Sequence, residues 1–169
     1  MRGVLVKRLR SYWKMEAANV LFVPAFAAYL VHSGGDEIGW LLIVAMLSTS
    51  ALLVAGTVAL RAHYLTVAGD GDAIARVVPM LARSQLPLAL LSVAGVLAAG
   101  VLHWQEAAWT PAVIAAWVLS ALATLEYVNY YHIQLQHFDH APDRARLLAG
   151  KGFRASHLAR AIRHYRAAN

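Results

Sequence analysis

The sequence predicts an all-α integral membrane protein, built as an antiparallel bundle of four transmembrane helices with both termini in the cytoplasm. Three observations lead to this fold class. The composition is 60% hydrophobic and 14% charged, whereas soluble domains average about 45–50% apolar and about 25% charged residues. Four apolar stretches are each long enough to cross about 30 Å of hydrocarbon as a helix. The lysines and arginines are confined to segments that lie on one side of such a bundle.

The four apolar stretches define the expected spans. We place them at about residues 13–31, 38–60, 86–102 and 111–131. Pro87 and Pro111 stand at the expected helix starts, where a missing N–H costs nothing, and Pro24 should kink the first helix. A soluble bundle of unusually apolar helices is disfavoured, because a soluble helix needs a polar face. Residues 88–101 contain only Ser92 as a polar side chain.

The distribution of charge sets the expected topology. All fifteen lysines and arginines fall in the N-terminal segment, in the connection between the second and third spans, or in the C-terminal tail. Loops 32–37 and 103–110 contain none of them and carry Asp36, Glu37 and Glu106 instead. The positive-inside rule therefore predicts cytoplasmic termini and a cytoplasmic (inner) membrane location.

The basic segments outside the spans are expected to lie at the membrane surface. Residues 1–13 and 73–83 are predicted as short amphipathic interfacial helices, and residues 143–169 as a basic amphipathic tail beyond a membrane domain at 1–142. Anionic lipid of the inner leaflet is the expected partner. Nucleic acid is not expected as a partner, because the positive-inside distribution of charge already accounts for the cations.

Gly95 and Ala99 allow close helix packing, either inside the bundle or in a homo-oligomer or membrane complex.

Polar residues within the spans mark the candidate binding site, because such groups are costly in lipid and usually retained for a reason. At about 100° per residue, Glu126, Asn129 and Tyr130 share one face of the fourth span. The other spans carry polar groups at a comparable depth in the membrane. Among these, Arg61 could form an ion pair with Glu126. These groups form either a structural polar cluster or a pocket open to the inner leaflet. The predicted ligand-binding residues are Asn19, Arg61, His63, Glu126, Asn129 and Tyr130.

The functional expectation is a small membrane protein that binds a lipid-soluble ligand in this pocket or serves as an accessory subunit of a membrane complex. One alternative is a membrane-embedded enzyme that acts on a lipid or quinone through Glu126 and His132. Another is a small transporter formed by oligomerisation. The absence of cysteine excludes thiolate chemistry. No metal site is expected; the alternative is zinc or iron held by His137, Asp139 and His140.

Overall fold

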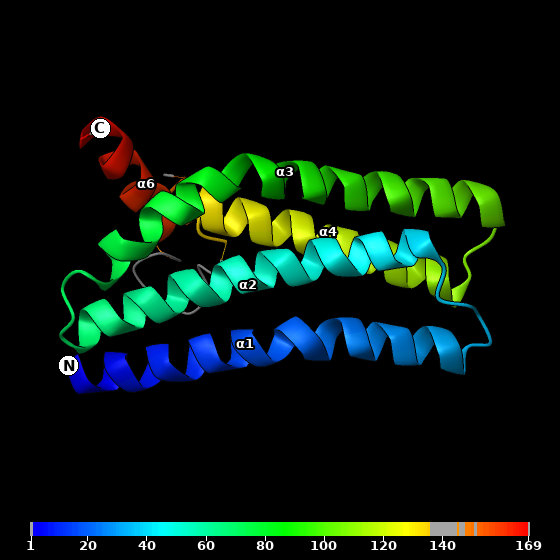
Figure 1. Cartoon of the computed structure of the whole chain (residues 1–169), viewed down its shortest axis with the longest axis horizontal. Helices are drawn as coiled ribbons and strands as arrows, with labels where there is room; N and C mark the ends of the chain where they lie inside the picture. Colours follow the sequence, from blue (N-terminus) through cyan, green and yellow to red (C-terminus); the bar gives the residue numbers. More distant parts are fainter. Residues whose placement is uncertain (1, 136–144, 146–147, 151, 169) are drawn as a thin grey trace.

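The computed structural model describes residues 2–135, 145, 148–150 and 152–168. Within these residues the fold is all-α: four long apolar helices pack as a bundle, and a short helix packs across one end of it (Figure 1). The helices are α1 (Arg2–Ser33), α2 (Trp40–Ala68), α3 (Ala73–Glu106), α4 (Pro111–Tyr131) and α6 (His157–Ala168). The predicted all-α four-helix bundle is thus confirmed. All four long helices are long and apolar enough to cross a membrane.

Two of the long helices extend further than the sequence suggested. α1 is continuous from Arg2, so the expected separate interfacial helix over residues 1–13 is not formed; no glycine or proline interrupts residues 4–23. α3 begins at Ala73 rather than near residue 86, and Pro79 and Pro87 lie inside it. The separate interfacial helix expected at 73–83 is therefore the first part of α3. This part runs obliquely to the rest of the helix (Figure 1), as proline inside a helix favours.

The end of the bundle opposite α6 is held by the start of α4. Thr110 caps this helix, since its hydroxyl accepts a hydrogen bond from the Val113 N–H at 3.3 Å, and Pro111 follows at the first helical position. Asp36, in the α1–α2 loop, accepts a bond from the Ala112 N–H at 2.9 Å. One of the free N–H groups at this helix start is thereby satisfied by a side chain from another loop.

Small and hydroxylated side chains bring α2, α3 and α4 close together in the bundle interior. Gly95 of α3 is buried, and a Cβ at this position would lie 3.2 Å from the Ser48 hydroxyl of α2. The Thr49 hydroxyl donates a hydrogen bond to the Leu119 carbonyl of α4 at 2.9 Å. Ala99 is fully buried as well. The face formed by Gly95 and Ala99 therefore packs inside the bundle.

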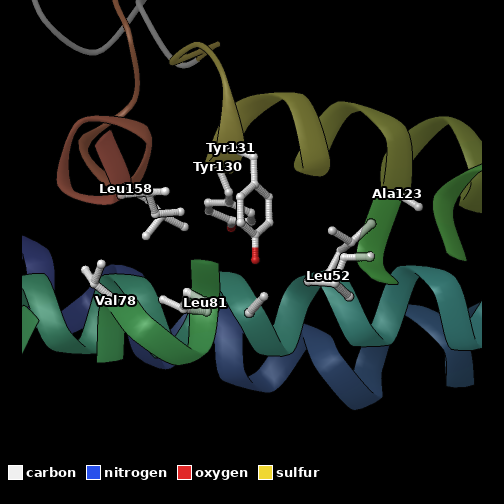
Figure 2. Packing of buried hydrophobic residues seen from close by; sticks show 10 residues of the cluster. Leu52, Val78, Leu81, Ala123, Tyr130, Tyr131 and Leu158 are labelled. Carbon is white, nitrogen blue, oxygen red and sulfur yellow. The ribbon is translucent and has the colours of Figure 1, made fainter. Parts of the chain in front are cut away.

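A hydrophobic cluster joins α6 to the bundle at what we call the α6 end (Figure 2). Leu52 of α2, Leu81 of α3, Ala123 of α4 and Leu158 of α6 are each at most 5% exposed and belong to this cluster. Burial of such side chains contributes about 1.5–3 kcal/mol each for the larger ones. The described part of the basic tail is therefore packed onto the helices through an apolar face.

Candidate ligand-binding site at the α6 end

Tyr130 is the central residue of the candidate site. It lies in the last turn of α4 and is only 8% exposed. Its ring packs on the backbone of α2 at Gly56, where a Cβ would overlap two ring carbons and the hydroxyl oxygen, so the absence of a side chain there makes room for the tyrosine. Figure 2 shows Tyr130 beside Leu158 and above α2. The hydroxyl donates a hydrogen bond to Glu16 Oε1 of α1. One side chain of α4 thereby contacts both neighbouring helices.

Glu126 and Asn129 extend this polar group along α4. The Asn129 amide nitrogen lies 3.5 Å from Glu126 Oε2, and its carbonyl oxygen accepts a hydrogen bond from the Leu135 N–H at 2.9 Å. Glu126 is half-buried and lies close enough to Tyr130 and Glu16 to interact with both. The structure thus brings together three residues that the helical face predicted and adds Glu16.

Glu16 was not among the predicted ligand-binding residues. It stands one turn before Asn19 on α1, and both side chains are half-buried. The signal that could have found it is its spacing, since residues 16 and 19 lie on one face of a helix. Nothing local in the sequence indicates that this face turns towards Tyr130.

A cavity of about 110 Å³ opens beside Tyr130, between α6 and the long helices. It contains three of the predicted residues, namely His63, Asn129 and Tyr130, within a mostly apolar wall. Its full lining is Ala59, Leu60, His63, Ile74, Leu81, Asn129, Tyr130, Gln134, Ser156, His157 and Leu158. A mostly apolar cavity with a few converging polar groups is typical of a small-molecule site.

Hydrogen bonds from the end of α4 to the start of α6 close one side of this cavity. The Gln134 N–H donates to the Arg154 carbonyl at 2.8 Å, and the Ser156 N–H donates to the His132 carbonyl at 3.2 Å. The Ser156 hydroxyl donates to the Tyr130 carbonyl and accepts from the Ala159 N–H at 2.9 Å. Ser156 therefore caps α6 and holds it against the last turn of α4.

Two imidazoles lie at the edge of the cavity. The rings of His63 and His157 have their centroids 4.7 Å apart. Arg160, one turn further along α6, is close enough for its charge to act on His63. Arg160 therefore adds a positive charge on this side of the cavity, which favours ligand groups that accept hydrogen bonds.

Other predicted residues lie elsewhere. Arg61 is exposed, and its guanidinium lies 5.9 Å from the centre of the Trp13 ring; within the part of the chain that the structure describes it forms no ion pair with Glu126. His132 ends α4, is exposed and packs its ring 5.4 Å from that of Tyr127. Arg61 and His132 are thus not brought into the group around Tyr130.

The alternative metal ligands His137, Asp139 and His140 lie outside the described residues. Among the residues that are described, no three His, Cys, Asp or Glu side chains come together as a possible metal site. The cavity is lined by hydrogen-bonding groups and apolar side chains.

The fold and the cavity define a class, a four-helix bundle apolar enough to cross a membrane with a small, mostly apolar cavity at one end. Comparison of the chain with models of protein families, with curated proteins and with solved structures finds no match. The functional conclusion therefore depends on the residues themselves.

Proposed function

We propose that the chain is a small multi-pass protein of the cytoplasmic membrane that binds a lipid-soluble ligand in the cavity at the α6 end. The ligand places a small head group that accepts hydrogen bonds between His63, His157 and Asn129. The observation that carries this proposal is the cavity itself, because residues from α2, α3, α4 and the start of α6 converge on it.

The charge distribution supports the orientation in the membrane. The described lysines and arginines lie on the first half of α1, near the end of α2, near the start of α3 and in residues 152–168, all towards the α6 end. Asp36, Glu37 and Glu106 lie at the opposite end. By the positive-inside rule, this arrangement favours an α6 end that faces the cytoplasm, next to anionic lipid.

The size and chemistry of the cavity support a small head group. Its volume of about 110 Å³ is somewhat below the roughly 150 Å³ of an engineered apolar cavity that accepts benzene. His63 and His157 offer ring N–H donors near the charge of Arg160. A carbonyl or hydroxyl on a small ring or glycerol-like head would match these donors.

Native mass spectrometry of the protein in mild detergent tests this proposal. We expect the wild-type chain to retain a small hydrophobic molecule, and Ala59→Phe to lose it because the new ring fills the cavity. Val54→Phe is the matched control, since Val54 is 47% exposed on the same helix. Equal retention in both variants, or no bound molecule in the wild-type chain, would contradict the assignment.

A further inference from the structure

The histidine side of the cavity at the α6 end carries a positive charge and, within the part of the chain that the structure describes, no negative one. None of the residues that line the cavity is an aspartate or a glutamate. Of the charged groups that are described, only Arg160 acts on His63. Glu16 and Glu126 interact with Tyr130 and with each other, and neither acts on His63. The potential on this side of the cavity is therefore positive.

The guanidinium group of Arg160 is held in place by a contact within α6. Its Nη2 lies 3.0 Å from His157 Nδ1. A guanidinium has donors only, so His157 accepts through Nδ1 and its neutral ring carries the proton on Nε2. The His157 ring in turn packs on the ring of His63, with the centroids 4.7 Å apart. The charge of Arg160 is therefore fixed beside the two imidazoles that border the cavity.

Two polar side chains in the cavity wall have no hydrogen-bond partner among the described residues. They are the ring of His63 and the side-chain amide of Gln134, and both residues are half-buried. Each can present an N–H to a ligand. Other acceptors in the wall are already in use, since the Asn129 carbonyl oxygen binds the Leu135 N–H and the Ser156 hydroxyl binds the Ala159 N–H. A ligand that brings its own acceptor oxygens would satisfy the two remaining donors.

We propose that the ligand of this cavity is a lipophilic acid, an amphiphile whose head is a carboxylate. This inference rests on the proposed function and specifies the charge of its ligand. An ionised carboxylate only accepts hydrogen bonds, so it matches the N–H groups of His63 and Gln134, and the charge of Arg160 compensates its own. The alkyl chain follows the apolar part of the wall, which includes Leu60 and Leu81.

Charge and size separate this class of ligand from other amphiphiles. A cationic head would lie beside Arg160 and be repelled. A phosphate monoester carries about −1.5 to −2 charges, which a single guanidinium does not balance. A phosphodiester has a further group on each side of the phosphate, for which a cavity of about 110 Å³ leaves little space. A carboxylate is both singly charged and small.

Decanoate is a suitable probe, titrated at pH 8 into the full chain in nanodiscs of zwitterionic lipid and followed by calorimetry against empty nanodiscs. We expect saturable binding with one site per chain. Decanol has the same chain with a neutral head, and decyltrimethylammonium has it with a positive one. Each should bind at least about tenfold more weakly than decanoate. Decyl phosphate distinguishes the two kinds of oxyanion and should also bind more weakly.

Substitutions identify the group that recognises the charge. Arg160→Gln should weaken decanoate binding about tenfold or more and leave decanol binding unchanged, whereas Arg160→Lys should retain much of the preference. Arg163→Gln is the matched control, because it removes the same charge from an exposed position one turn further along α6, and it should leave both affinities unchanged. Ala59→Phe should abolish decanoate binding.

A thermal melt of each variant shows whether the fold is kept. If Arg160→Gln fails to fold, Gln134→Leu provides the test, because it removes the amide donor at nearly constant volume. This variant should weaken decanoate binding severalfold and leave decanol binding unchanged.

Four results would overturn the proposal. Equal binding of decanoate and decanol, both lost in Ala59→Phe, would show that the cavity binds a ligand without recognising its charge, and the proposed function would stand. An equal loss in Arg160→Gln and Arg163→Gln would show that only the overall charge of α6 matters. Full decanoate binding in Ala59→Phe would place the acid outside the cavity. Absence of saturable binding by any of the probes would exclude the acid, while native mass spectrometry of the retained molecule would still test the proposed function separately.

Discussion

Substitution of Gly56 by alanine tests the packing at the centre of the site. A methyl group at position 56 would overlap with Cζ, Oη and Cε2 of Tyr130. The tyrosine cannot easily yield, because its hydroxyl is bound by Glu16 and its backbone carbonyl by Ser156. Relief of this overlap therefore requires the ring or α2 to shift, which should weaken both the Glu16 contact and the wall of the cavity.

The expected magnitude follows from two opposing effects. Alanine is the better helix former by about 1 kcal/mol. Overpacking of a filled interior costs about 1–3 kcal/mol, and overlap with three atoms of a tyrosine side chain that is held at both ends places Gly56→Ala in the upper part of that range. We expect the free energy of unfolding to fall by about 1–2 kcal/mol.

The matched control is Gly100→Ala, also within a helix, where a Cβ would meet no atom within 4 Å. This substitution should be neutral or stabilising by up to about 1 kcal/mol. Denaturant unfolding in mixed micelles, followed by circular dichroism, measures both variants. In a double-mutant cycle, Gly56→Ala should hardly change the free energy of unfolding when Tyr130 is already replaced by leucine. Equal stability of Gly56→Ala and Gly100→Ala would refute the packing of Tyr130 on Gly56.

Three further predictions concern other parts of the chain. Ser156→Ala should cost about 1 kcal/mol of capping energy and speed hydrogen exchange within α6; unchanged exchange would mean that this serine does not hold the helix. The Arg76 guanidinium beside Asp70 lowers the pKa of that carboxyl, so the contact is present above the ordinary pKa of aspartate and lost as pH falls through the lowered value. Arg76→Gln should therefore raise the pKa of Asp70 in a carbon-13 NMR titration, and no rise would contradict the pairing. Because the chain has no cysteine, single cysteines at Glu37 and Ala168 report topology: only the first should react with an impermeant thiol reagent outside the cell, and the reverse pattern would invert the proposed orientation.

The sequence alone determined the fold class, because the hydrophobic stretches are a local property of the chain. A run of about 20 apolar residues must form a helix to satisfy its backbone in lipid, whatever its neighbours do. The face of α4 that carries Glu126, Asn129 and Tyr130 followed from helical periodicity for the same reason. Helix bounds were less well predicted, since α3 continues through Pro79 and Pro87. A helix can tolerate proline where its neighbours support the freed backbone groups.

Only the tertiary structure decided which polar groups meet. Arg61 and Glu126 looked like partners by depth alone, but the rotation of α2 directs Arg61 to Trp13 and leaves Tyr130 beside Gly56. Glu16 acquires its role from a contact with a residue 114 positions later in the chain. Periodicity gives the direction of a side chain relative to its own helix, whereas such contacts depend on the tilt and rotation of each helix against the others. Those angles result from packing over the whole bundle, including Gly95 between α2 and α4 and Leu158 against α4, and no local stretch of sequence contains them.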